Sequence, residues 1–358
     1  MTTAGAAPLI ELPEAGAPPE TRGLTRDGVR LLVAGDELAH ARFRDLPSLL
    51  APGDLLVVNT SRTLPAALSA RRPAGDVVDL HLSTPVPTAA ADAPSPRASR
   101  GRSLLDTDGD RWVVEIRRAG ARVRYARAGE RLSLPDGASA ELLAPHLGSR
   151  LWVARLDLGE PLLGYLERHG RAIRYAHTER EWPLDAYQNV YATEPGSAEM
   201  PSAGRPFTHE LIVRLMASGV DVAPLLLHTG VSSLERGEAP YPERFGVPEW
   251  TAERVGLARR LGGRVIAVGT TVVRALESAT GEDGVTRAAS GWTGLVIGPE
   301  RPIRALDGVI TGFHDADSSH LMLLEQVGGP KRLAGAYRAA AEAGYLRHEF
   351  GDLLLLLR

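Results

Sequence analysis

The chain contains no cysteine among its 358 residues. This absence excludes disulfide bonds, thiolate nucleophiles, cysteine-zinc sites and iron–sulfur clusters, and it agrees with a reducing compartment. Lysine is almost absent too: removing the single Lys331 from the 41 basic residues leaves 40 arginines. Schiff-base chemistry therefore has almost no candidate, whereas arginine remains available to bind carboxylates and phosphates.

Long apolar runs and several familiar catalytic motifs are also missing. No run is long enough for a transmembrane helix, and the first residues do not resemble a signal peptide, so we expect a cytoplasmic protein without membrane contact. The Walker loop, the dinucleotide glycine fingerprint, the zinc-protease motif and the nucleophile elbow are absent. We expect neither a metal nor a cofactor. The net charge of -3 means that any RNA contact depends on a local basic patch.

Short alternating apolar segments between residues 66 and 158 predict a small β-barrel domain without a convincing helix. The expected strands are Asp76–Leu82, Arg111–Ile116, Ala121–Tyr125 and Leu151–Asp157. A stretch rich in Pro, Ala, Ser and Arg at 84–103 predicts a flexible loop within this domain. Its arginines could contact a polyanion, although a solvated loop is the better explanation.

Strand–helix alternation from about residue 200 onward predicts an α/β domain with a largely parallel sheet. The expected strands are 54–59, 221–227, 264–268, 291–297, 309–313 and 353–357, and the expected helices are 207–218, 249–261, 271–279, 318–327 and 331–343. We therefore expect a discontinuous α/β catalytic domain, residues 1–65 and 159–358, with the barrel of 66–158 inserted. We expect a monomer.

Polar or glycine-containing turns follow four of these expected strands. They begin at Asn59, His228, Gly269 and Phe313. Because open α/β sheets bind ligands beyond the carboxyl ends of their strands, four such turns predict a binding cleft there.

Two of these strand ends carry histidines, and a third opens a helix. His228 and His314 can serve as base or acid near neutral pH, although a lone histidine is more often structural. Asp315 and Asp317 suit helix capping better than catalysis. The Gly269-Thr270-Thr271 turn can bind an anion at the helix N-terminus, or it can be an ordinary capped turn.

Several blocks, in order along nearly the whole chain, match one enzyme family. GDLLVVNTSRTLPAAL at 53–68, YQNVYA at 187–192, PSAG at 201–204 followed by Phe207, LHTG at 227–230, and RVIAVGTTVVRALESA at 264–279 carry the match, with Phe313-His314 and Tyr345 to Asp352. The chain thereby resembles the S-adenosylmethionine:tRNA ribosyltransferase-isomerases of queuosine biosynthesis.

The resemblance implies that the chain transfers and isomerises the ribosyl part of S-adenosylmethionine onto 7-aminomethyl-7-deazaguanine in tRNA. The expected product is epoxyqueuosine, with adenine and methionine released, and S-adenosylmethionine serves as co-substrate. On this interpretation His228 and His314 supply acid–base catalysis. The expected substrate-binding residues are Asn59, Arg62, Tyr187, Gln188, Gly204, Gly230, Gly269, Thr270, Thr271, Arg274, Glu277 and Phe313, with Glu277 orienting Arg274.

The chain departs from the family pattern at Pro206, Ser232, Ser233, Gly312 and 346–350, and Arg117-Arg118 at best replace a basic stretch of the β-domain. Three interpretations stay open: a tRNA-modifying enzyme, a paralogue that uses the same sulfonium chemistry on a free nucleobase or a natural-product intermediate, or a catalytically silent S-adenosylmethionine- or RNA-binding protein.

Overall fold

A computed structural model describes residues 10–87, 110–146, 150–231, 241–315 and 319–358. The helices are α1 (Leu46–Leu49), α2 (Leu162–His169), α3 (His209–Ala217), α4 (Glu249–Arg260), α5 (Thr270–Ser278), α6 (Ser319–Gly328) and α7 (Pro330–Glu342). Within the described ranges none of them combines the length and apolarity needed to cross a bilayer.

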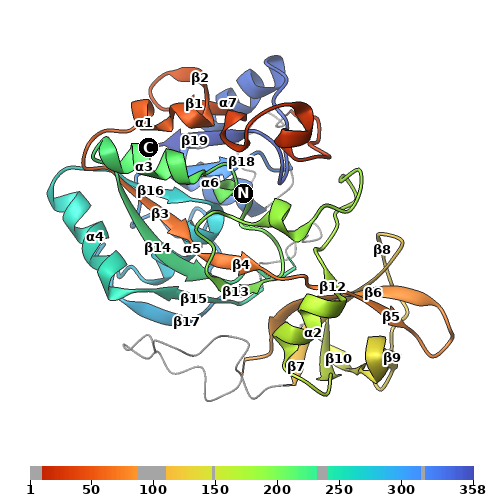
Figure 1. Cartoon of the computed structure of the whole chain (residues 1–358). Coiled ribbons are helices and arrows are strands. Elements are labelled where there is room, and N and C mark those ends of the chain that lie inside the picture. Colours follow the sequence, from red (N-terminus) through yellow and green to blue (C-terminus); the bar gives the residue numbers. More distant parts are fainter. Residues whose placement is uncertain (1–9, 88–109, 147–149, 232–240, 316–318) are drawn as a thin grey trace, which may run out of the picture.

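The larger of the two main sheets has nine strands in the order β17-β15-β14-β3-β16-β18-β19-β1-β2 (Figure 1). They are β1 (Arg30–Ala34), β2 (Leu38–Arg42), β3 (Leu55–Asn59), β14 (Asp221–Leu227), β15 (Glu243–Val247), β16 (Val265–Val268), β17 (Ala289–Thr293), β18 (Gly308–Gly312) and β19 (Leu353–Leu357). The four central strands β14, β3, β16 and β18 run parallel, so their carboxyl ends lie at one edge.

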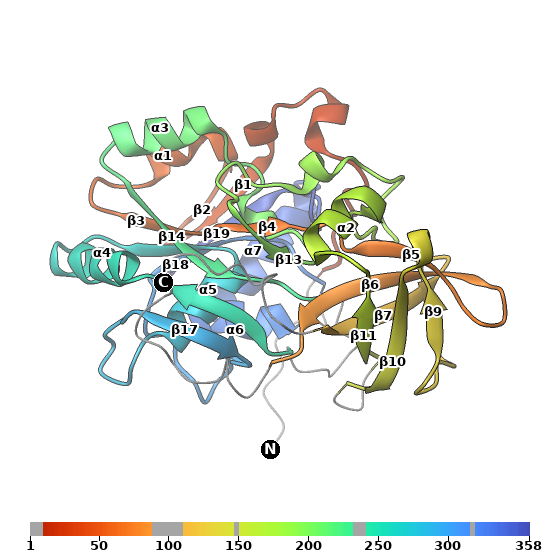
Figure 2. The ribbon, with the colours of Figure 1, turned by 60° about the horizontal axis from the view of Figure 1, so that its bottom comes forward.

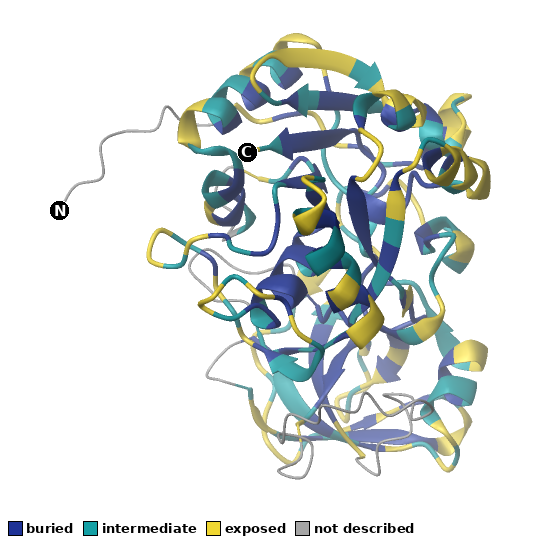
Figure 3. Cartoon of the chain, turned by 90° about the vertical axis from the view of Figure 1, so that its left-hand side faces the viewer, coloured by how far each residue is buried: buried dark blue, intermediate teal, exposed yellow. Residues whose placement is uncertain are grey.

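Alternation along β3 explains why this sheet is covered on both faces. Leu55 and Val57 belong to one apolar core with α4, α5, α6 and α7, while Leu56 and Val58 belong to another with α1 and α3. Neighbouring side chains of a strand point to opposite faces, so a strand that is buried throughout needs cover on both. Figure 2 shows α1 and α3 on one side of the sheet, and Figure 3 shows the buried strands behind partly exposed helices.

The second sheet closes into an antiparallel barrel. Its strands are β5 (Ala67–Arg71), β6 (Val77–Pro85), β7 (Arg111–Arg118), β9 (Arg131–Ser133), β10 (Ser139–Pro145) and β11 (Trp152–Asp157), and the β11–β7 and β5–β9 pairings complete the ring. Two short strands extend it: β8 (Ala121–Arg122) and β12 (Gly170–Arg171). α2 packs on β5, and a parallel pair, β4 (Ser61–Thr63) with β13 (Glu194–Ser197), lies between sheet and barrel (Figure 1).

The expected α/β fold with an inserted barrel is confirmed, and the domain boundaries at 65 and 158 stay a prediction. The sheet is mixed rather than largely parallel, because the edge strands β17 and β2 and the inner strands β15 and β19 add antiparallel pairs. β8 ends at Arg122, so the expected strand 121–125 was too long, and β17 spans Ala289–Thr293, so the expected strand 291–297 began and ended too late. The expected loop at 84–103 also began too early: Thr84 and Pro85 belong to β6, and residues 88–109 lie outside the described part of the chain.

Candidate active site

A cavity of about 190 Å³ lies at the carboxyl ends of β14, β16 and β18. Its lining includes Thr229–Val231 after β14, Gly269–Thr271 after β16 and Thr311–His314 at the end of β18. Ser83 and Thr84 of barrel strand β6 also line it, as does the segment 199–203. The cleft expected at this edge of the sheet is therefore present, and the barrel supplies part of its wall.

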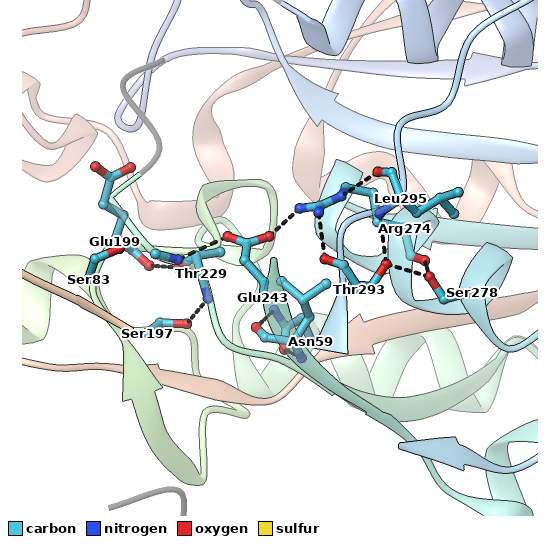
Figure 4. Close-up of polar contacts among 12 residues, drawn as sticks. Asn59, Ser83, Ser197, Glu199, Thr229, Glu243, Arg274, Ser278, Thr293 and Leu295 are labelled. Atoms are coloured by element: carbon cyan, nitrogen blue, oxygen red, sulfur yellow. Dashed lines mark hydrogen bonds and ion pairs between the residues drawn. The ribbon is translucent and has the colours of Figure 1, made fainter. Parts of the chain in front are cut away.

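The turn after β14 is held by three side chains from three different elements. The backbone N–H of Thr229 donates to Ser197 Oγ at 3.0 Å, that of Gly230 to Glu243 Oε1 at 2.9 Å, and that of Val231 to Ser83 Oγ at 2.9 Å. A Cβ at Gly230 would come within 2.6 Å of Ser83 Oγ. Glycine therefore lets this turn approach the barrel closely. Figure 4 shows this turn with its side-chain partners.

A buried ion pair joins α5 to β15 beside this turn (Figure 4). Arg274 Nη1 donates to Glu243 Oε2, its Nε donates to Leu295 O at 3.1 Å, and its Nη2 donates to Thr293 O at 3.0 Å. The two charged side chains are 10% and 9% exposed, so each depends on the other for compensation. Arg274 and Glu243 both line the cavity.

Glu277 does not orient Arg274, contrary to the expectation. Its Oε1 accepts hydrogen bonds from the backbone N–H groups of Arg304 at 2.8 Å and Ala305 at 2.7 Å. Helix α5 is buried on nearly every side, so side chains three positions apart on it meet different segments. The carboxylate that pairs with Arg274 comes instead from Glu243, which lies on a different element, β15.

The turn after β16 has the features of an anion-binding helix start. Gly269 has φ +97°, a conformation that favours glycine, and it immediately precedes α5. The first N–H groups of a helix have no partner inside the helix, and the helix dipole favours negative charge there. Thr271 Oγ1 is buried with no hydrogen-bond partner among the described residues. A bound group could therefore use both the backbone and this hydroxyl.

His314 lines the cavity beside a second histidine that the sequence analysis did not single out. Its Nε2 lies 2.9 Å from Thr311 Oγ1, and its ring centroid lies 4.4 Å from that of His320. Burial, together with His320 and His348, holds the pKa of His314 well below its usual range. Burial and the charge of Arg274 lower the pKa of His320 to about 4. Both imidazoles are therefore uncharged at neutral pH and able to accept a proton.

His228 occupies a different environment. It is buried, it is not among the cavity-lining residues, and its Nδ1 lies 2.8 Å from Ser61 Oγ, which in turn lies 2.5 Å from Ser197 Oγ. Burial and the charge of Arg244 lower the pKa of His228 to about 3. The structure thus brings only His314 of the expected pair to the cavity, and catalysis by His228 stays a prediction without geometric support.

Asn59 and Gln188 lie outside the cavity lining and bind backbone. Asn59 Nδ2 donates to Leu227 O at 2.7 Å and its Oδ1 accepts from Leu227 N at 3.0 Å, which joins the ends of β3 and β14. Gln188 makes the same kind of paired contact with the N–H and C=O of Thr63, at 3.0 and 2.8 Å. Both amides therefore position strand ends that lead to the cavity.

The remaining expected residues divide in the same way. Gly230, Gly269, Thr270, Thr271, Arg274 and Phe313 line the cavity, whereas Arg62, Tyr187, Gly204 and Glu277 do not. Arg62 is exposed, and Tyr187 packs on Phe350 with ring centroids 5.4 Å apart. A Cβ at Gly204 would collide with the Tyr191 hydroxyl, so this glycine is explained by packing.

Of the departures from the family pattern, Gly312 and the pair His348-Glu349 line the cavity and Pro206 does not. Nothing lies within 4 Å of a Cβ built on Gly312, so the cavity is wider there. Ser232 and Ser233 lie outside the described residues. Asp315 lies in the described part and pairs with Arg347, while Asp317 does not lie in it.

Sequence reasoning missed the acidic part of the lining. Glu199, Glu243 and Glu349 contribute three carboxylates, against the single guanidinium of Arg274 among the described lining residues. Removal from water, together with the negative charge of Glu199, raises the pKa of the Tyr175 hydroxyl well above its usual range. Glu199 lies two residues before PSAG, and Glu243 lies in β15, a strand that we did not predict. In the sequence, only the short distance of Glu199 from the block PSAG could have indicated this carboxylate.

Comparisons with known proteins agree on one family. A family model described as queuosine biosynthesis protein matches residues 11–356. The S-adenosylmethionine:tRNA ribosyltransferase-isomerase of Thermus thermophilus is 36% identical over 346 residues, covering 93% of both chains. The enzyme of the same name from Anaeromyxobacter sp. strain Fw109-5 is 37% identical over 348 residues, again covering 93% of both. The crystal structure of S-adenosylmethionine tRNA ribosyltransferase from Thermotoga maritima matches with a TM-score of 0.52 and 26% identity, over 98% of this chain and 99% of that one.

Proposed function

The chain belongs to the S-adenosylmethionine:tRNA ribosyltransferase-isomerase family, and on that basis we propose that it catalyses the family's reaction. It transfers the ribosyl part of S-adenosylmethionine to the aminomethyl group of 7-aminomethyl-7-deazaguanine in tRNA and isomerises it to the epoxide of epoxyqueuosine. Adenine and methionine leave. The chain is therefore a transferase and isomerase of tRNA modification that uses S-adenosylmethionine as a substrate.

The observation that supports this function most directly is the charge of the cavity. Three carboxylates and one guanidinium line it, and the three imidazoles of His314, His320 and His348, whose pKa values burial lowers, add no charge. S-adenosylmethionine carries a sulfonium cation, and the acceptor carries a primary amine that is protonated in water. An acidic cavity attracts both cations and repels phosphate. A modified base can then enter while the RNA backbone stays outside.

We place the methionine carboxylate at the start of α5. This assignment uses the free N–H groups of the helix start, the dipole of α5 and the unpartnered hydroxyl of Thr271. The methionine carboxylate, the one anionic group of the substrate, would thus bind at the N-terminus of α5, whose residues Thr270 and Thr271 line the cavity. Arg274, which already binds Glu243 and two carbonyls, keeps this helix against β15.

We assign proton abstraction to His314. The sulfonium acidifies the neighbouring C5′ hydrogens, so a neutral imidazole beside the sugar can accept one of them. His314 has the required uncharged form at neutral pH, and Thr311 Oγ1 at 2.9 Å fixes its ring. Methionine leaves as a neutral thioether, which needs no acid. Adenine departure is helped by protonation or hydrogen bonding of its ring.

Adenine release separates this function from its alternatives. The full-length protein is incubated with S-adenosylmethionine and one of three partners: tRNA carrying 7-aminomethyl-7-deazaguanine, the same tRNA carrying guanine, or no RNA. We expect adenine and methionine in equal amounts with the modified tRNA only. Equal release without RNA would show that the acceptor is not tRNA. Binding of S-adenosylmethionine without release in any arm would show a silent binding protein.

Salt dependence tests the tRNA contact separately. Arg118 on β7 is an exposed arginine, 65% accessible, on the barrel that borders the cavity. If the barrel contacts phosphates, Arg118→Ala should weaken tRNA binding and reduce the slope of log affinity against log salt by about one. Its ion pair with Asp76 at 3.6 Å is partly exposed and contributes little to stability, so folding should be preserved. An unchanged slope would place the RNA on another surface.

A further inference from the structure

Two histidines and a carboxylate that the proposed reaction does not use lie together at the cavity wall. His177 Nε2 lies 2.6 Å from Glu349 Oε2, and the His177 and His348 rings stack with centroids 4.1 Å apart. One potential ligand atom from each of the three residues lies within 4.8 Å of the others. The side chains of His177, His348 and Glu349 are 11%, 17% and 18% exposed, so the cluster is mostly buried.

The surroundings hold these side chains in place. The Tyr175 ring stacks on the His177 ring with centroids 5.5 Å apart and an interplanar angle of 10°, which restricts the ring of His177. Glu14 Oε1 lies 3.5 Å from His348 Nε2, which adds a second carboxylate near the cluster. The nearby guanidinium of Arg347 is already paired with Glu14 and Asp315. Carboxylates therefore balance the positive charge at this position.

The backbone also departs from its usual form here. His348 has φ +72°, in the left-handed region that non-glycine residues seldom adopt. Such conformations persist where the surrounding structure enforces them, and they concentrate at functional sites. In this case the unusual backbone turns His348 and Glu349 toward both the cavity and His177.

Two imidazole nitrogens and one carboxylate oxygen are a ligand set for a divalent transition-metal ion. Imidazole suits Zn²⁺, Cu²⁺, Fe²⁺ and Ni²⁺, and a His₂Glu set leaves a coordination position open in catalytic zinc sites. Stacked rings do not yet point their lone pairs at one point. Because Tyr175 restricts the ring of His177, the adjustment falls to His348, whose Cβ–Cγ torsion has broad minima.

We infer that His177, His348 and Glu349 form a binding site for a divalent transition-metal ion of the Zn²⁺ type at the wall of the cavity. His348 and Glu349 stand in the segment 346–350 that departs from the family pattern, so the site is a property of this chain rather than of the shared reaction. The ion would join the segment after β12 to the C-terminal segment before β19. Its open position would face water or an oxygen or nitrogen atom of a bound substrate.

Cobalt substitution tests the site without reference to the enzymatic reaction. Full-length protein without an affinity tag is stripped with a chelator, dialysed and titrated with Co²⁺. We expect one Co²⁺ per chain, visible ligand-field bands, and their loss when Zn²⁺ is added. His177→Ala and Glu349→Gln should each weaken binding at least about 100-fold, because even outer partners of metal ligands contribute 10- to 100-fold.

His348→Asn is the variant best matched to the backbone. Asparagine tolerates the left-handed conformation, so the chain should fold while the imidazole ligand is lost. His209→Asn, on an exposed residue at the start of α3, is the matched control and should bind Co²⁺ like the parent. The absence of ligand-field bands from the parent protein would overturn the site. So would bands that survive unchanged in folded His177→Ala and His348→Asn.

Discussion

Two parts of the cavity lining handle charge in opposite ways. The helix side, comprising Gly269, Thr270, Thr271, Arg274 and Glu243, pairs its buried charges with each other and with backbone carbonyls. The histidine side, comprising His314, His320, His348 and Glu349, relies on burial to keep most of its imidazoles uncharged. The helix side is thus a fixed receptor, whereas the histidine side can still exchange protons.

The two sides also differ in their relation to the family. Three of the helix-side residues and Arg274 lie in the block 264–279, which follows the family pattern closely, while His348 and Glu349 stand where the pattern is lost. Within that block Arg274 depends on Glu243 of β15, because the two form a buried ion pair. Each member of a buried ion pair constrains the other.

The largest expected effect is a loss of folding stability when the ion pair of the helix side is broken. Glu243→Gln leaves the guanidinium of Arg274 buried without a carboxylate, and we expect the free energy of unfolding to fall by about 3–5 kcal/mol. Urea unfolding measures this. Glu253→Gln, at an exposed position of α4, should change stability by less than about 0.5 kcal/mol. Equal stability of both variants would mean that the pair is not a structural unit.

Removing the base should be the largest effect on the histidine side. His314→Gln should slow adenine release by about 100- to 10,000-fold, because it removes the group to which we assign acceptance of the C5′ proton. Binding of S-adenosylmethionine should change little, and the exposed His209→Gln serves as control. A rate within tenfold of the parent would exclude His314 as the base.

Acid should destabilise the histidine side selectively. The pKa of a histidine in the unfolded chain is 6.5, whereas the pKa of His320 in the folded protein is about 4. Between these values the unfolded state binds more protons, so stability falls as pH falls, by at most about 3 kcal/mol for this residue. His320→Leu should therefore lose less stability than the parent between neutral and acid pH in urea unfolding. An identical loss in both proteins would contradict the assignment.

The smallest effect concerns one hydroxyl of the helix side. Thr271→Val keeps the shape of the side chain but removes the unpartnered Oγ1, so KM for S-adenosylmethionine should rise about five- to tenfold with little change in kcat. Thr271→Ser retains the hydroxyl and should behave like the parent. Should both variants raise KM equally, the methyl group rather than the hydroxyl would be responsible.

Local pattern was sufficient for most of the α/β domain. The expected strand 221–227 agrees with β14 at both ends, and the expected helices differ from α4, α5, α6 and α7 by one residue at most boundaries. β15 was missed because Glu243–Val247 carries no clear alternation and pairs only through distant β14 and β17. The same holds for β13, whose partner β4 is far away in the sequence.

For the cavity, the sequence predicted which turns line it but not which residues those turns contact. It indicated Gly269, Thr271, Arg274 and His314, all of which line the cavity, because their type and position after strands are local properties. It also nominated Asn59, Gln188 and His228, which are directed into backbone contacts and the core. Whether a polar side chain at a strand end faces a ligand or a neighbouring strand depends on the elements beside it.

The sequence by itself determined the family, the α/β fold with its inserted barrel, and the edge of the sheet at which ligands bind, because these follow from short-range periodicity and contiguous blocks. Only the tertiary structure decided that Glu243 rather than Glu277 balances Arg274, that His320 rather than His228 accompanies His314, and that His177 meets His348 and Glu349. Those pairings join residues up to 172 positions apart, a separation that no local pattern encodes.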